Sequence, residues 1–291
     1  MMQRIIRSVM IVWFAIAVSS VRADTVIASI KPVSLIAAEL LRGVAEVETL
    51  LPDGASPHDF SLRPSDRLKV DAASLIIWVG PETEPYLTRV ITAAGVSDLS
   101  WQESEEEHAG HAHNHADEHE HGDLHPWLSL ESAEHFSERL ALRLKQLFPE
   151  NAAKIEENER VFLTSLAQFD VEARQRLAPV QSEGFFVFHD AYQGLVEHFE
   201  LNQVGYFTLD PSRKPGAKHL AQLRQQLEQS AASCVFVEPQ FNPALVESIT
   251  RGLSVKQGEL DPLATGIELT PGAYLDFMER LVAQLSSCLA P

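Results

Sequence analysis

Short runs of consecutive apolar residues alternate along this chain with longer stretches in which apolar residues recur at helical spacing. A strand that is apolar at every position is covered on both faces, as strands are in parallel sheets flanked by helices. The alternation therefore predicts βα units and an α/β fold. We expect strands at 25–30, 47–51, 75–79, 185–188, 204–207, 234–237 and, in a shorter run, 253–255, with helices at 33–41 and 64–73 in the first half.

These elements group into two lobes with central parallel-rich sheets, residues 24–148 and 179–291. The segment from about Asn151 to Leu177 contains no Gly or Pro, and its apolar residues recur at helical spacing. An uninterrupted helix of this length would span roughly 40 Å at 1.5 Å per residue. We expect residues 149–178 to form one rigid helix that joins the lobes and limits hinge motion. The alternative is one more packed surface helix.

The N-terminus has the pattern of a signal peptide over residues 1–23. Arg4 and Arg7 precede an apolar run over 9–18, and a cleavage-like Val-Arg-Ala follows at 21–23. The apolar run is shorter than the roughly 20 residues that a membrane-spanning helix needs, although a retained anchor is the alternative. No cysteine lies near the cleavage site to carry a lipid. We therefore expect a soluble periplasmic protein that begins at Asp24.

The chain is strongly acidic, with 41 Asp and Glu residues against 23 Lys and Arg residues. Nucleic acid and anionic lipid are poor partners for such a surface, and we expect neither. The acidity alone does not indicate cation binding, because a solvated acidic surface also favours solubility.

Only two cysteines occur, Cys234 and Cys288. In an oxidising compartment they are expected to form a disulfide, which would tie a helix-like C-terminal segment to a core strand. The alternative is a pair of thiolate metal ligands, which the wide spacing and the lack of a neighbouring histidine disfavour.

Residues 103–123 form a segment in which histidines alternate with carboxylates. It lacks the apolar residues needed to bury itself, so we expect a mobile solvated loop. Imidazole suits Zn, Cu, Ni or Co, and the segment is therefore predicted to hold several weak accessory metal sites, unless its composition has no function. The candidate ligands are His108, His111, His113, His115, His119 and His121.

Three further histidines lie beside ordered elements. His58 lies in a loop that follows an expected strand, His125 precedes a helix-like run, and His189 ends the strand at 185–188. Loops at the carboxyl ends of parallel strands are where open α/β sheets bind ligands. Asp261 follows the last strand-like run and is a fourth candidate. Each alone is a weak signal, but if the lobes face each other the four could form a tetrahedral zinc site in the interlobe cleft.

A set of motifs in the same order resembles the zinc-specific solute-binding proteins of bacterial ABC importers. The motifs cover essentially the whole chain after residue 23 and lie at 52–60, 62–66, 123–127, 188–192, 238–240 and 260–263. The resemblance implies two α/β lobes joined by a long rigid helix, with one metal ion bound between them. It also implies delivery of the ion to an inner-membrane permease and its cytoplasmic ATPase.

Residue by residue, the resemblance implies that His58, His125 and His189 are imidazole ligands, that Asp261 is the carboxylate ligand, and that the two cysteines pair. Two departures from the family pattern are visible. Pro57 stands where some zinc binders have a Glu ligand, so Asp261 or water must complete the shell. Leu124 stands before His125 where Pro is usual, with Pro126 after it instead.

Three imidazoles favour Zn²⁺ over Mn²⁺, which prefers more carboxylate oxygen. We expect a monomeric zinc receptor that is not an enzyme. The alternatives are a manganese-binding paralogue, a periplasmic zinc buffer without a transporter, and a zinc-dependent hydrolase. The hydrolase is disfavoured because the sequence has no His-Glu-x-x-His motif and no evident general base.

Overall fold

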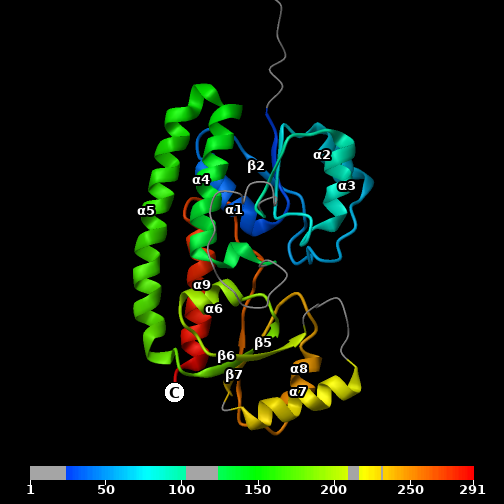
Figure 1. Ribbon diagram of the computed structural model, residues 1–291, viewed down its shortest axis with the longest axis vertical. Helices are drawn as coiled ribbons and strands as arrows, with labels where there is room; N and C mark the ends of the chain where they lie inside the picture. Colours follow the sequence, from blue (N-terminus) through cyan, green and yellow to red (C-terminus); the bar gives the residue numbers. More distant parts are fainter. Residues whose placement is uncertain (1–23, 103–123, 209–215, 231) are drawn as a thin grey trace, which may run out of the picture.

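Two four-stranded parallel sheets form the centres of two lobes, one above the other in Figure 1. The computed structural model describes residues 24–102, 124–208, 216–230 and 232–291. The expected signal peptide and the His-rich segment 103–123 lie outside these residues. The two sheets confirm the predicted α/β fold, and the division at 23, 148 and 178 stays a prediction.

The N-terminal sheet has the strand order β2-β1-β3-β4. Its strands are β1 (Val26–Ala28), β2 (Val47–Thr49), β3 (Leu75–Trp78) and β4 (Asp98–Ser100). Helices α2 (Pro64–Ala72) and α3 (Pro85–Ala94) cover one face, while α1 (Lys31–Leu40) and α4 (Leu130–Leu147) lie on the other (Figure 1). Every residue of the apolar strands β1 and β3 is buried, as the run of consecutive apolar residues predicts.

The C-terminal sheet has the order β6-β5-β7-β8. Its strands are β5 (Gly184–His189), β6 (Gln203–Thr208), β7 (Ala232–Val237) and β8 (Lys256–Glu259), with helices α6 (Gln193–His198), α7 (Ala217–Gln229), α8 (Ala244–Thr250) and α9 (Ala273–Leu289). The expected strand at 253–255 was wrong, because the strand is the following segment, β8. This edge strand has the sequence Lys-Gln-Gly-Glu and is mostly exposed, so no apolar run marks it.

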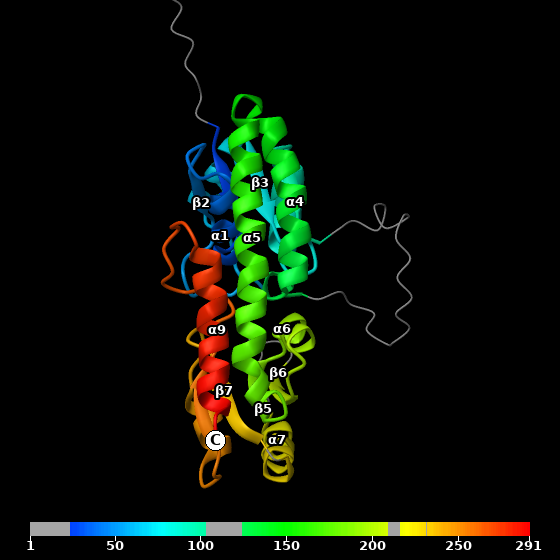
Figure 2. The same ribbon diagram turned by 90° about the vertical axis from the view of Figure 1, so that its left-hand side faces the viewer.

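One long helix, α5 (Ala152–Leu177), joins the lobes and confirms the predicted connection. Short 3₁₀ turns, η3 (Pro149–Asn151) and η4 (Ala178–Val180), flank it. It packs along α4 in the upper lobe and along α9 in the lower lobe (Figure 2). The buried Asn158 side chain donates hydrogen bonds to the carbonyl oxygens of Leu40 and Arg42, at 3.0 and 2.9 Å. The helix is therefore fixed to both lobes along its length.

Cys234 in β7 and Cys288 in α9 form a disulfide, which confirms the predicted pairing and excludes the thiolate-ligand alternative. The bond attaches the last helix to a central strand of the C-terminal sheet. Among the described residues, no helix combines the length and apolar character needed to cross a membrane.

Candidate metal centre

His58 lies in the loop between β2 and α2, where it is half buried. Gly54 turns this loop with a φ of 77°, a left-handed conformation that glycine adopts without strain. The backbone N–H of His58 donates to the hydroxyl oxygen of Ser56 at 3.3 Å. Ser56, Pro57 and His58 of this loop line the cavity at which the histidines meet.

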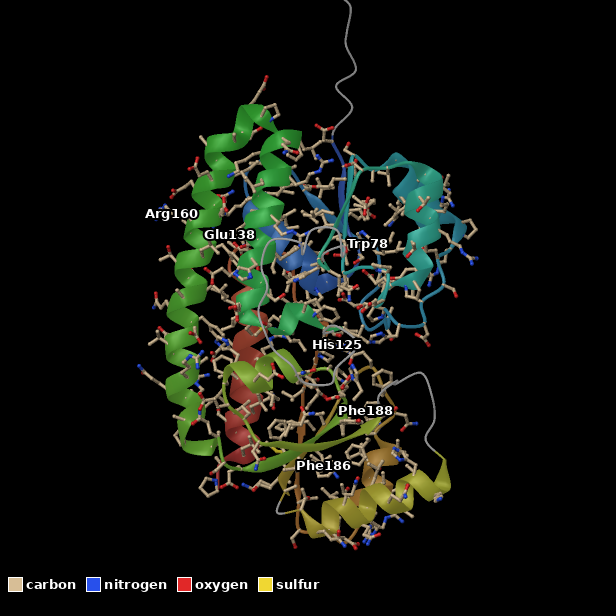
Figure 3. The ribbon with its side chains drawn as sticks, viewed as in Figure 1. Trp78, His125, Glu138, Arg160, Phe186 and Phe188 are labelled. Atoms are coloured by element: carbon tan, nitrogen blue, oxygen red, sulfur yellow. A yellow bond between two sulfur atoms is a disulfide. The ribbon has the colours of Figure 1, made fainter. Side chains whose placement is uncertain are left out.

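His125 is buried and directly precedes the 3₁₀ turn η2 (Pro126–Leu128). Figure 3 shows it between the two sheets. Trp127, in this turn, donates its indole N–H to the carbonyl oxygen of Pro262 at 2.6 Å. The hydroxyl of Tyr274 donates to the carbonyl oxygen of Trp127 at 2.9 Å. The segment that carries His125 is therefore attached to the C-terminal lobe at two points.

His189 is the last residue of β5, and Glu238 directly follows the neighbouring strand β7. Because parallel strands end at the same edge of a sheet, the two side chains meet there. Nδ1 of His189 lies 2.6 Å from Oε1 of Glu238, and both side chains are buried.

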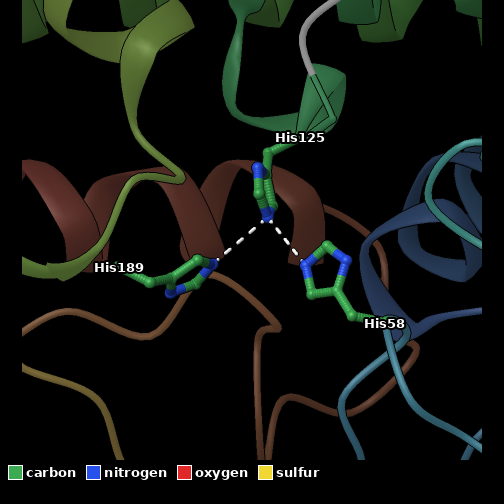
Figure 4. Close-up of side chains that lie close together, drawn as sticks. All are labelled: His58, His125 and His189. Atoms are coloured by element: carbon green, nitrogen blue, oxygen red, sulfur yellow. Dashed lines mark hydrogen bonds between the residues drawn. The ribbon is translucent and has the colours of Figure 1, made fainter. Parts of the chain in front are cut away.

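The three imidazoles converge on one point between the lobes (Figure 4). Nε2 of His125 lies 3.1 Å from Nε2 of His58 and 3.2 Å from Nε2 of His189. In a tetrahedral zinc site with bonds of 2.0–2.1 Å, ligand nitrogens lie about 3.3 Å apart. The cavity among these side chains measures about 10 Å³, which is about the size of one small ion or water. The arrangement fits one metal ion.

Electrostatics favour the uncharged, metal-binding form of the central histidine. Burial holds the pKa of His125 well below its usual value, and the neighbouring His189 and His58 lower it further. A neutral imidazole is the form that coordinates a metal. Burial raises the pKa of Glu238, and the contact with His189 opposes that rise.

Asp261 lies near the site but is not one of the three residues whose ligand atoms gather within 4.8 Å of one another. Its carboxylate accepts hydrogen bonds from the backbone N–H groups of Leu263, at 3.0 Å, and Thr265. The Gln240 side chain also donates to it. Asp261 therefore holds the loop that follows β8.

Sequence reasoning missed Glu238 as a site residue, although the motif at 238–240 contributed to the resemblance. The available signal was its position, since it follows a strand at the same sheet edge as His189. The six histidines of the segment 103–123 lie outside the described residues.

The family described as zinc-uptake complex component A, periplasmic, matches residues 26–288. The chain belongs to this family. It is 42% identical over 288 residues to the high-affinity zinc uptake system protein ZnuA of Yersinia pestis, an alignment that covers 91% of each chain. It is 34% identical to the protein of the same name from Haemophilus ducreyi, over 94% of this chain and 96% of the relative. The family consists of solute-binding proteins.

Solved structures share the fold at lower identity. A crystal structure of ZnuA has a TM-score of 0.77 and 23% identity, covering 92% of this chain and 98% of its own. The solute-binding protein FpvC of Pseudomonas aeruginosa, solved with Ni²⁺, has a TM-score of 0.78 and 20% identity, covering 92% and 97%. These likenesses support the two-lobed architecture.

Proposed function

We propose that this protein captures Zn²⁺ in the periplasm and delivers it to an ABC-type permease for import across the inner membrane. The observation that carries the proposal is the convergence of three histidine ring nitrogens from both lobes on an ion-sized cavity. The names of the relatives, which describe high-affinity zinc uptake, support it. In this proposal residues 1–23 direct export, and the chain from Asp24 onward works as a monomer.

The proposed ligands are His58, His125 and His189. Three neutral nitrogen donors favour Zn²⁺, whereas Mn²⁺ would favour more oxygen. Asp261 is the candidate for the fourth position and water is the alternative. The Asp261 carboxylate accepts hydrogen bonds from Leu263, Thr265 and Gln240. To bind the ion, it would have to give up at least one of these bonds.

A catalytic role is not favoured by the size of the cavity. About 10 Å³ admits an ion but no organic substrate beside it. We therefore propose that the ion is cargo and that the protein is not an enzyme.

The test is zinc affinity, measured by competition with a chelator of known affinity. We would compare the purified protein, a deletion of 103–123, and His189→Ala within that deletion. One tight site should survive the deletion and disappear with His189→Ala, while His135→Ala, an exposed histidine on α4, should have no effect. Tight binding that disappears with the segment 103–123 would instead make the protein a His-rich buffer.

Three further measurements separate the remaining alternatives. A Mn²⁺ affinity equal to that of Zn²⁺ would contradict a zinc receptor. Asp261→Asn should weaken Zn²⁺ binding as strongly as His189→Ala if Asp261 is the fourth ligand, and only slightly if water is. Zinc affinity should also fall in acid, because protons compete with the ion for the imidazoles.

Delivery is tested in cells that lack this gene. They should grow poorly in zinc-limited medium and recover with the wild-type gene but not with His189→Ala. Normal growth of the deletion strain would favour a buffer without a transporter.

A further inference from the structure

Glu238 contacts Nδ1 of the His189 ring, whereas Nε2 of the same ring faces His125. Oε1 of Glu238 lies 2.6 Å from Nδ1 of His189 and 3.4 Å from the backbone nitrogen of the same residue. The exposed fractions of the two side chains are 4% for His189 and 1% for Glu238. Water therefore has little access to this contact. The Glu238 carboxylate is the fixed hydrogen-bond partner of Nδ1 of His189.

When Glu238 is ionised, this contact determines which ring nitrogen of His189 carries the proton. An ionised carboxylate only accepts hydrogen bonds, so Nδ1 must be the donor. In the neutral ring Nε2 then keeps its lone pair, and Nε2 is the nitrogen that faces His125 at 3.2 Å. Without the carboxylate, the proton could move to Nε2 and be donated to Nε2 of His125. Nε2 of His189 would then carry a proton, and the lone pair of His125 Nε2 would accept the hydrogen bond. Neither nitrogen could bind the ion.

The second oxygen of Glu238 supplies an independent observation. Oε2 is buried and has no hydrogen-bond partner among the described residues. A buried carboxylate oxygen without a hydrogen-bond partner is costly. Glu238 lines the same cavity as the three histidines. A divalent ion in that cavity would place a positive charge close to this oxygen.

We propose that Glu238 is a positioning residue for metal capture. Its carboxylate selects the His189 tautomer whose Nε2 lone pair faces the ion, and its charge offsets part of the ion's charge from outside the coordination shell. The inference rests on the proposed function, because it concerns the same three-histidine site. Carboxylates that hold the outer nitrogen of a ligating histidine orient the ring and increase its basicity.

The experiment compares Glu238→Gln with Glu183→Gln. Glu183 lies at the opposite end of the same two strands, where it accepts a hydrogen bond from the Ser233 side chain at 2.5 Å. Glu238→Gln should weaken Zn²⁺ binding by roughly 10- to 100-fold, the usual effect of losing such a partner, and Glu183→Gln should not change it. Both variants should be checked for folding by thermal unfolding without metal.

Nitrogen NMR of the metal-free protein, labelled in its histidine rings, supplies a readout that a structural role alone would not change. In the wild type, His189 should show a protonated Nδ1 and an unprotonated Nε2. Glu238→Gln should give a mixture, because an amide can accept from Nδ1 or donate to it. Glu238→Asp keeps the charge and the acceptor and should recover more affinity than Glu238→Gln does.

Wild-type affinity in Glu238→Gln, or a protonated Nε2 on His189 in the wild type, would overturn the inference. If Glu238→Gln fails to fold, an affinity in Glu238→Asp no better than that of His189→Ala would also overturn it. Loss of tight binding in His189→Ala with full binding in Glu238→Gln would leave the proposed function intact and remove only the role of Glu238. Tight binding in His189→Ala would contradict the proposed function itself.

Discussion

The indole N–H of Trp127 donates to the carbonyl oxygen of Pro262 across the interlobe boundary, at 2.6 Å. Trp127 lies two residues after His125, and Pro262 directly follows Asp261. Trp127 is fully buried, and its own carbonyl oxygen accepts from Tyr274. The Trp127 side chain therefore connects the segment that carries His125 in the first lobe to the loop that carries Asp261 in the second.

Trp127→Phe should lower the free energy of unfolding by about 2 kcal/mol, because it leaves a buried carbonyl oxygen without its donor. It should also weaken zinc binding, because the segment that carries His125 loses one of its two attachments to the C-terminal lobe. Trp101→Phe is the matched control, since Trp101 donates to Ser132 within the first lobe at 2.9 Å. Chemical denaturation and chelator competition measure the two effects. Equal zinc affinities in the two variants would contradict a link between Trp127 and the site.

Zinc should bind without a large closure of the lobes. Backbone N–H groups of the second lobe, at Gly266 and Gly272, already donate to Asp53 and Glu39 of the first lobe. Together with α5, these bonds hold the lobes in contact. Small-angle scattering of the zinc-loaded protein and of the protein stripped with a chelator should give nearly superimposable profiles. A clearly larger radius of gyration without metal would show that the lobes open.

Glu84 should make the protein less stable as the pH rises from about 4.5 to 7. Burial raises the pKa of its carboxyl to about 7. The hydrogen bonds donated by Val79, Ser29 and Tyr86 lower the pKa and offset only part of this rise. The folded state then binds more protons than the unfolded state across this window, so stability falls with rising pH and stays lower above it. At about 1.4 kcal/mol per pKa unit, the free energy of unfolding should fall by roughly 3 kcal/mol across this pH range.

Glu84→Gln should remove this pH dependence, because the amide carries no charge. Its oxygen can still accept from Val79 and Ser29, whereas its NH2 group must donate to the hydroxyl oxygen of Tyr86. Denaturation at pH 5 and pH 8 in the absence of metal measures it. The difference in unfolding free energy between variant and wild type should grow with pH. A constant difference would mean that Glu84 does not titrate in this range.

Removing the disulfide should lower the free energy of unfolding by about 4 kcal/mol, the loop-closure value for a separation of 54 residues. The double variant Cys234→Ala, Cys288→Ala tests this by chemical denaturation. A reductant should shift the wild type in the same direction and leave the double variant unchanged. Equal stability of wild type and variant would show that the bond contributes nothing.

The elements that bury apolar runs could be predicted from the sequence. The strand at 185–188 could be predicted because its consecutive apolar residues indicate a strand buried on both faces. The helix at 151–177 could be predicted because apolar residues at helical spacing indicate one buried face. His58, His125 and His189 could be selected because each lies beside an ordered element. Their convergence required the arrangement of the lobes, which spacing along the chain does not contain.

Features that depend on polar pairing could not be predicted. β8 lies at a sheet edge with exposed polar side chains, so its backbone pairing with β7 leaves no apolar pattern. Glu238 becomes part of the site only because β7 lies beside β5. The hydrogen bonds of Asp261 come from its own loop and from Gln240, and their geometry depends on the folded turn.

Two of the proposed ligands, His58 and His125, belong to the first lobe, and His189 belongs to the second. Zinc–nitrogen distances tolerate only about 0.2 Å of variation. A relative displacement of the lobes by about an ångström would therefore leave the ion with two imidazoles. The residence time of the ion is then set by the stiffness of the interlobe contact, and substitutions far from any ligand could lengthen or shorten it without altering the coordination chemistry.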